Sequence, residues 1–187
     1  MEDSCSSGEE VAYKQFKYLF ILGLYPELTG AVPGAGGLDA ADILLESPHT
    51  GFAIIAIDCI VLESLWGFIN GKPVPSRQEQ QVYKEILSGQ NFRWKEDQCE
   101  SFRQFVRNGI MHDAETRNGW LLVKADPDSV VPAGKAGEYR LNRTKFHNAL
   151  KGTFEDWIEK LRGGDQELRR NMRKRMNQII AKHYGKK

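Results

Sequence analysis

Apolar residues recur at three- and four-residue steps along most of the chain, and this spacing predicts a mainly α-helical fold. The longest such stretch runs from Phe52 to Ile69 and is apolar around most of its circumference. A helix of that kind must be covered on several sides, so we expect it to be the central one. Ser47 and Pro48 suit its N-cap and first turn.

Further stretches show the same helical spacing and predict additional helices. They lie at 9–24, 76–87, 95–109, 146–161 and about 165–183. Ser76 and Glu79 resemble a capping box at the start of the second of these helices. Gly109 is well placed to end the third in the left-handed conformation.

Two regions depart from the helical pattern. Residues 26–40 are rich in glycine and proline and predict a long loop. Residues 120–123 and 138–142 read as short strands that flank a Pro- and Gly-bearing loop, so we expect a small β-hairpin at about 119–143. The expected fold is therefore mainly α, a helical bundle with an appended hairpin, and a single domain over residues 1–187.

Composition agrees with one globular, cytoplasmic domain. Of 187 residues, 41% are hydrophobic and 27% charged, which allows a sizeable core. Asp58 and Glu63 interrupt the longest apolar stretch and favour a core helix over a membrane span. Cys5, Cys59 and Cys99 are widely spaced with no CxxC pair, so we expect reduced thiols and no metal site. The start is acidic and polar, unlike a signal peptide.

Charge is distributed unevenly although the net charge is only +1. From Arg162 onward, the sequence contains nine Lys and Arg residues and two carboxylates. On the C-terminal helix the cations alternate with an apolar stripe, so one face can follow an RNA backbone or be an ordinary solvated surface. The RNA contacts we expect are Arg103, Arg169, Arg170, Arg173 and Lys174.

One short segment has a pattern with chemical meaning. Arg107 and His112 are separated by four residues at the end of a predicted helix, within the run Phe105-Val-Arg-Asn-Gly-Ile-Met-His-Asp-Ala-Glu-Thr-Arg. This R-x4-H pattern resembles the signature of the HEPN superfamily, and the longer run is similar to a motif in bacterial HEPN-like proteins. The resemblance covers residues 52 to about 117.

The resemblance implies a metal-independent endoribonuclease that works as a homodimer without a cofactor, in a defence or stress setting. The residue types suit that chemistry. Imidazole titrates near neutral pH and can take the proton of a ribose 2′-hydroxyl, which gives His112 the role of base. A permanently charged guanidinium at Arg107 can stabilise charge on the scissile phosphate. Asn108 can bind the phosphate or cap the turn, and Glu63 is the acidic residue expected to orient Arg107 or His112.

Spacing sets a condition on this site. Five steps along a continuous α-helix leave two side chains about 140° apart. Arg107 and His112 therefore converge only if Gly109 breaks the helix or if each residue meets its counterpart from a second subunit. Ala114 occupies the place where family members paired with nucleotidyltransferase antitoxins have tyrosine, which argues against that form of regulation. An antitoxin or other regulatory protein stays open as a partner.

Other readings of the same residues stay open. Arg107 can belong to a solvated ion-pair face with Glu96, Glu100 and Arg103, and His112 can be a capping or core histidine. The chain would then be a non-catalytic HEPN-like module that binds nucleotide, RNA or protein, or a purely structural protein. His49, His147 and His183 have no partners at ligand spacing and read as structural or solvated. Glycines 34, 36 and 37 complete no phosphate-binding motif.

Overall fold

The computed structural model describes residues 37–47, 49–75, 79–124, 128, 130–132 and 138–184. The predicted helix at 9–24, the capping-box serine at position 76 and most of the predicted loop at 26–40 lie outside these residues. The elements are α3 (Gly37–Leu45), α4 (Gly51–Asn70), α5 (Glu79–Leu87), α6 (Glu96–Ser101), the π-helix η3 (Phe102–Arg107), α7 (Asn108–Asp113), β1 (Leu121–Val123), β2 (Val130–Pro132), β3 (Tyr139–Asn142), α8 (Arg143–Arg162) and α9 (Gln166–Tyr184).

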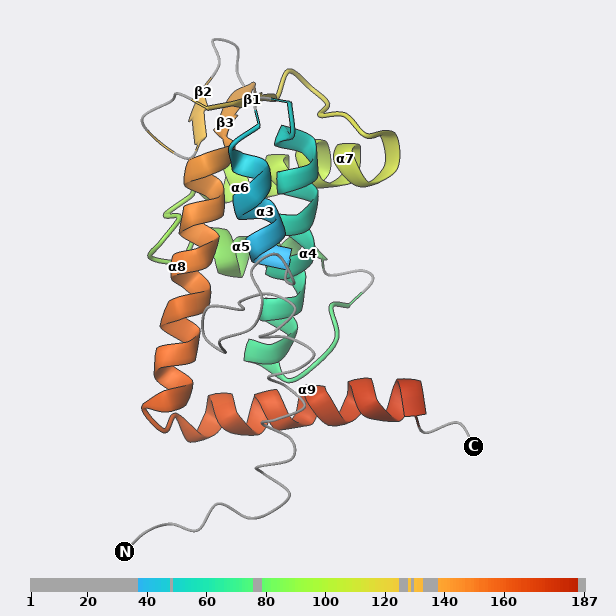
Figure 1. The fold of residues 1–187 in the computed structure, drawn as a ribbon, viewed down its shortest axis with the longest axis vertical. Helices are drawn as coiled ribbons and strands as arrows, with labels where there is room; N and C mark the ends of the chain where they lie inside the picture. Colours follow the sequence, from blue (N-terminus) through green and yellow to red (C-terminus); the bar gives the residue numbers. More distant parts are fainter. Residues whose placement is uncertain are drawn as a thin grey trace, which may run out of the picture.

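Helix α4 runs through the centre of the molecule, as its all-round apolar pattern predicted (Figure 1). It packs against α3, α5, α7, α8 and α9. By length and composition alone α4 could also cross a membrane, but 56% of its most apolar window is buried inside the bundle. The prediction of a mainly helical fold with α4 as a core helix is confirmed.

Aromatic side chains from several elements fill the core beside α4. Phe102 stacks on Phe146 with ring centroids 5.1 Å apart, and Trp94 meets both rings edge-on or tilted at 5.4 and 5.7 Å. Phe102 and Phe146 are fully buried. Each such ring contributes about 1.5–3 kcal/mol by leaving water, so this cluster ties α8 to η3 firmly.

The sheet differs from the predicted hairpin. The two predicted strands form β1 and β3, but they pair in parallel, with Leu122 opposite Leu141. A third strand, β2, lies inside the predicted loop and pairs antiparallel with β3, with Val130 opposite the same Leu141. The hairpin prediction was wrong because β2, the next strand after β1 in the chain, lies on the far side of β3. β1 and β3 are therefore neighbours in the sheet without being consecutive in the chain.

The sequence interpretation missed one helix and placed the start of another differently. Residues 37–40, assigned to the loop, belong to α3. The N-cap of α4 is Thr50 rather than Ser47, and the Thr50 hydroxyl donates to the carbonyl of Leu44 at 2.5 Å. Since that bond joins the start of α4 to the end of α3, the cap sets the angle between these helices instead of satisfying the free amides of α4.

Helix α9 lies across the C-terminal end of α4 (Figure 1). The Asn171 side chain donates to the carbonyl of Ile69 at 2.9 Å and thereby satisfies one of the open carbonyls at the end of α4. Gly71 ends α4 in the left-handed conformation at φ 63°, and a Cβ there would lie 3.0 Å from the Asn171 backbone. The close approach fixes α9 with Met172 and Met176 buried and with Arg170, Arg173 and Lys174 exposed.

Candidate active site

Arg107 lies on a helix that continues without a break from Glu96 to Asp113. Its central segment, η3, is a π-helix, a rare form that often marks functional sites. The prediction that Gly109 ends this helix was wrong. Gly109 is inside α7, and Ala114 takes the left-handed position at φ 57° instead.

Gly109 is required for a different reason. A Cβ at this position would lie 2.3 Å from the backbone oxygen of Glu115, closer than real Cβ contacts allow. The chain after α7 turns back over this glycine, and the amide of Arg117 donates to the carbonyl of Phe105 at 2.9 Å. The turn therefore fixes the end of α7, which carries His112, against η3, which carries Arg107.

Arg107 points toward α4 and makes its main contacts with Glu63. Its Nε donates to Glu63 Oε1 at 2.9 Å, and Nη2 lies 2.9 Å from the same oxygen. Nη1 donates to Asn108 Oδ1 at 3.1 Å and is 4.0 Å from Glu79 Oε2. The arginine side chain is only 16% exposed. The expected role of Glu63 in orienting Arg107 thus agrees with the contact that the structure contains.

Tyr83 completes this cluster from α5. Its hydroxyl donates to Glu63 Oε1 at 2.7 Å. Burial, together with the neighbouring Cys59 and Glu63, raises the pKa of Tyr83 well above its usual value, so the phenol keeps its proton. Burial alone would lower the pKa of Arg107, but Tyr83, Glu63 and Glu79 outweigh it and raise that pKa. The guanidinium is therefore a fixed positive charge held by two helices.

His112 lies on the outer side of α7 and is exposed. No hydrogen bond or ion pair joins it to the part of the chain that the structure describes. Because the helix is unbroken between them, Arg107 faces α4 while His112 faces outward, about 140° around the axis. One copy of the chain does not bring the two side chains together.

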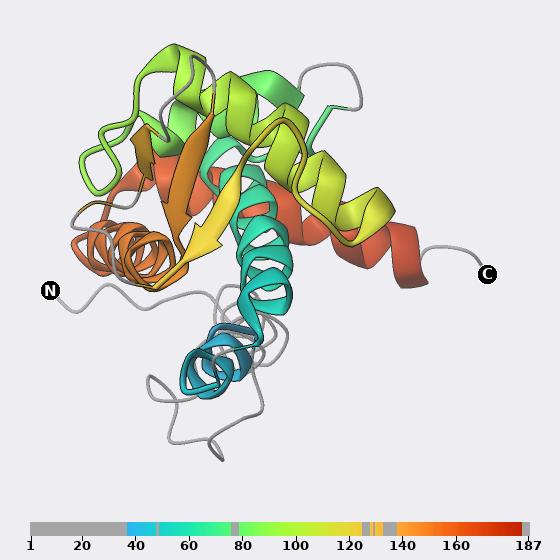
Figure 2. The same ribbon diagram turned by 90° about the horizontal axis from the view of Figure 1, so that it is seen from above.

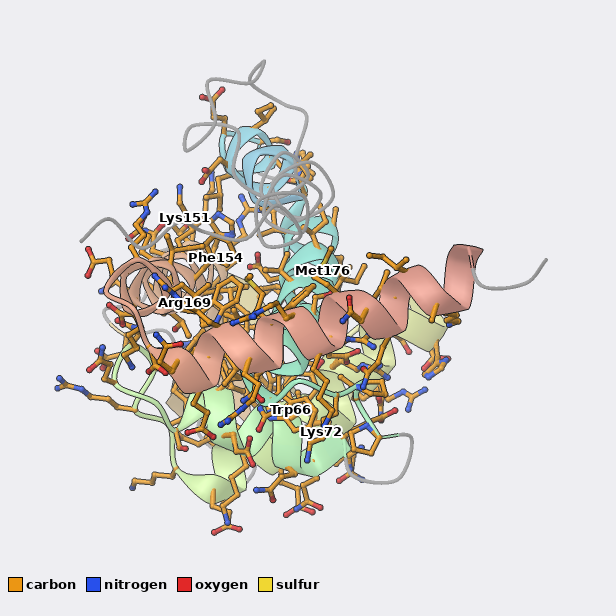
Figure 3. All side chains as sticks on the ribbon, turned by 90° about the horizontal axis from the view of Figure 1, so that it is seen from below. Trp66, Lys72, Lys151, Phe154, Arg169 and Met176 are labelled. Carbon is orange, nitrogen blue, oxygen red and sulfur yellow. The ribbon has the colours of Figure 1, made fainter. Side chains whose placement is uncertain are left out.

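The residues expected to contact RNA fall into two groups. Arg103 is half-buried, and its Nε is buried without a hydrogen bond among the described residues. Arg169 is also half-buried and donates to the carbonyl of Leu161 at 3.0 Å, on the side of α9 that faces α8 in Figure 3. Arg170, Arg173 and Lys174 are exposed and line a shallow hollow of about 830 Å³ along α9.

The sequence interpretation took His147 as structural or solvated and missed the buried polar cluster around it. His147 Nδ1 lies 2.7 Å from Asp58 Oδ1, and Nε2 lies 3.1 Å from Asp42 Oδ1. Lys151 Nζ donates to Asp42 Oδ2 at 2.7 Å. His147 and Asp58 are completely buried. The available signal was Asp58, a carboxylate on an otherwise apolar helix, which needs a partner.

Over the described residues, no three His, Cys, Asp or Glu side chains are grouped as metal ligands. Cys59 and Cys99 are buried free thiols, and burial raises the pKa of Cys99 to about 11. Thiols held protonated in this way are poor nucleophiles.

Comparison of the chain with protein-family models, with curated proteins and with solved structures gave no match. The chemical interpretation of the site therefore depends on the contacts described above and on the sequence motif.

Proposed function

We propose that the protein is a metal-independent endoribonuclease of the HEPN type, active as a homodimer through Arg107 and His112. The observation that supports this most directly is the contrast between the two side chains. The guanidinium of Arg107 is fixed by Glu63, while the imidazole of His112 is exposed on the same rigid helix. Cleavage of RNA without a metal needs an anchored cation and an accessible base.

The proposed reaction is an internal phosphoryl transfer. The imidazole of His112 accepts the proton of a ribose 2′-hydroxyl, and the oxygen attacks the adjacent phosphorus. The bond from phosphorus to the 5′ oxygen breaks, and that oxygen takes up a proton on leaving. Arg107 stabilises the charge that builds on the phosphate oxygens. The products are a 2′,3′-cyclic phosphate and a 5′-hydroxyl end.

A second copy of the chain supplies the geometry that one copy lacks. Because Arg107 and His112 face different sides of one helix, the proposal pairs the His112 of one subunit with the Arg107 of the other. Ile60 on α4 and Met111 on α7 are 54% and 44% exposed, and these two helices pack against each other. Met111 adjoins His112 in the sequence, and exposed apolar side chains of this kind suit such a contact.

The basic face of α9 gives the proposed enzyme a means of holding its substrate. Arg170, Arg173 and Lys174 are exposed along one helix, where cations can follow successive phosphates. Arg169 and Arg103 are half-buried and contribute less. Affinity for RNA should accordingly fall as salt concentration rises.

The test is RNA cleavage by purified protein, with the ends of the fragments identified. We expect His112→Ala to abolish cleavage, and the wild-type fragments to carry 2′,3′-cyclic phosphates with EDTA present. His49→Ala is the matched control, since His49 is another exposed histidine. Cleavage by the His112→Ala protein at the wild-type rate would refute the mechanism.

A second candidate function is an RNA-binding module without catalysis. The ion pair of Arg107 with Glu63 favours it, because a half-buried arginine that is already paired can serve the fold alone. This module would bind RNA through α9 and leave it intact. If the wild-type protein binds RNA but does not cleave it, this second function is the correct one.

A further inference from the structure

A second hollow lies on the side of α4 away from α7, between the α5–α6 loop and α8. Figures 1 and 2 both show that loop beside α8 and α7 on the other side of α4. The hollow measures about 620 Å³, which is within the range of small-molecule sites. Its place is secured by Gln90 and Asn91 of the loop, which both donate to Asp156 of α8 at 2.6 and 2.8 Å.

The walls of this hollow combine cations with amides over an aromatic floor. Arg93, Lys95 and Lys145 line it and are exposed, against one carboxylate among the described residues, Asp128. The floor includes Phe92 and Trp94, which are buried and hold each other in an edge-on contact at 6.0 Å. The amide side chains of Gln98 and Asn148 complete the lining.

Arg93 occupies this hollow in an unusual backbone conformation. Its φ is 56°, in the left-handed region that favours glycine and asparagine over arginine. The conformation is imposed by the loop, because the amide of Arg93 donates to the carbonyl of Gly89 at 2.8 Å and that of Trp94 donates to Leu87 at 2.9 Å. A glycine would fit this backbone better. Arginine adds a guanidinium, whose Nε donates to the carbonyl of Gln90 at 3.0 Å, and strain of this sort is typical of functional sites.

The geometry points to a binding site for a phosphomonoester carried by a nucleoside, either a free nucleotide or the phosphorylated end of an RNA strand. The three cations would bind the phosphate, with Arg93 able to grip two of its oxygens. The apolar floor suits a base, and the amides of Gln98 and Asn148 suit the polar edge of that base. This site is separate from Arg107 and His112, so it stands whether or not the protein cleaves RNA.

The experiment measures binding to the full chain by calorimetry. It uses the His112→Ala protein so that RNA probes stay intact. The probes are AMP, adenosine and inorganic phosphate, followed by one RNA strand with a 5′-phosphate or a 5′-hydroxyl. We expect AMP to bind at least tenfold more tightly than adenosine or inorganic phosphate. Tighter binding of the RNA with a 5′-phosphate than of the RNA with a 5′-hydroxyl would identify the ligand as a strand end. Binding of AMP but of neither RNA would identify it as a free nucleotide.

Two variants separate binding from folding. Arg93→Gly should weaken AMP binding at least tenfold while the protein melts at the same or a higher temperature, because glycine relieves the left-handed backbone. Lys145→Gln should also weaken binding, whereas Lys160→Gln, an exposed lysine farther along α8 and outside the hollow, should not. Failure of millimolar AMP to bind, or unchanged binding by Arg93→Gly, would overturn the proposal.

Discussion

Glu63 of α4 holds Arg107 of η3 through a single carboxylate oxygen, which lies 2.9 Å from both Nε and Nη2. The hydroxyl of Tyr83 reaches the same oxygen at 2.7 Å. Three donors on one acceptor leave the guanidinium little freedom to rotate. A side chain fixed in this way can meet a phosphate without first losing conformational entropy, which is an advantage for binding and for catalysis alike.

Glu63→Gln should weaken both stability and the proposed cleavage. The glutamine keeps the shape of the side chain but removes the charge opposite Arg107. We expect a loss of about 1.5–3 kcal/mol in the free energy of unfolding, typical for a hydrogen bond to a charged group. Cleavage should fall by about 10- to 100-fold because the guanidinium is no longer held in place. Urea denaturation and initial cleavage rates measure the two effects.

The control is Glu96→Gln, which removes a carboxylate paired with Lys84 on the surface. Both partners of that pair are well exposed, at 66% and 44%. Surface pairs contribute only about 0–1 kcal/mol, so this variant should behave like wild type. Equal losses in the two variants would show that the contact of Glu63 with Arg107 has no special role.

Gly109→Ala should destabilise the protein even though alanine favours helices. The new Cβ would meet the backbone oxygen of Glu115, and relief requires the turn after α7 to move. We expect a cost of about 1–3 kcal/mol, measured by thermal or urea unfolding. Gly152→Ala, also within a helix, is the matched control, because the three atoms nearest to its Cβ belong to the side chain of Asn91, at 3.2 Å or more, and not to the backbone. If Gly109→Ala leaves the free energy of unfolding unchanged, the turn after α7 can move aside at little cost.

The long helices α4, α8 and α9 could be predicted because each carries its own apolar pattern, whereas the nine-residue helix α3 was not predicted. In α8, the stripe formed by Phe146, Leu150 and Phe154 is buried as its spacing indicated. The ends were harder to predict. Gly109 has the local signature of a helix C-cap, but the same residue type also serves where backbone segments approach closely, and only the folded turn distinguishes the two.

Contacts between distant segments were beyond sequence reasoning. The parallel pairing of Leu122 with Leu141 depends on the path of the intervening chain. The residues of each strand alone do not show whether the two strands run parallel or antiparallel. The pairing of Asp58 with His147 joins residues 89 positions apart. Within the candidate site, the sequence predicted that Glu63 orients Arg107 or His112, and the structure contains its contact with Arg107. The outward position of His112 depends on helix η3 continuing into α7.

Stability should fall as pH rises through the titration of His147. Burial alone would lower the pKa of His147, but its contacts with Asp58 and Asp42 outweigh burial and raise that pKa. A raised pKa means that the folded protein binds the proton more tightly than the unfolded chain does. The resulting stabilisation is complete below about pH 6.5, the value for an unfolded chain. It is lost as pH rises through the higher folded pKa.

Of the other charges around His147, Asp58 acts in the same direction and Lys151 opposes it. Burial raises the pKa of Asp58, against the opposing effect of His147, and so also favours the protonated cluster. Lys151, which contacts Asp42, lowers the pKa of His147, but the contacts with Asp58 and Asp42 outweigh it. Urea denaturation between pH 5.5 and 9 should show the decline in the wild type and in His112→Ala. His147→Gln should start less stable and show a much weaker decline, and an equal slope in that variant would contradict the assignment.

Ile60→Asp should separate the subunits of the proposed dimer without unfolding them. Ile60 is 54% exposed on α4, so a charge there remains solvated in a single subunit but would be buried between two. We expect the variant to sediment as a monomer, with unfolding free energy within about 0.5 kcal/mol of the wild-type value under conditions where both are monomeric. It should lose RNA cleavage, because Arg107 and His112 then lack their counterparts. Ile43→Asp on α3, where Ile43 is 59% exposed, is the control that should keep both properties. An Ile60→Asp monomer that cleaves RNA at the wild-type rate would show that one chain assembles the site by itself.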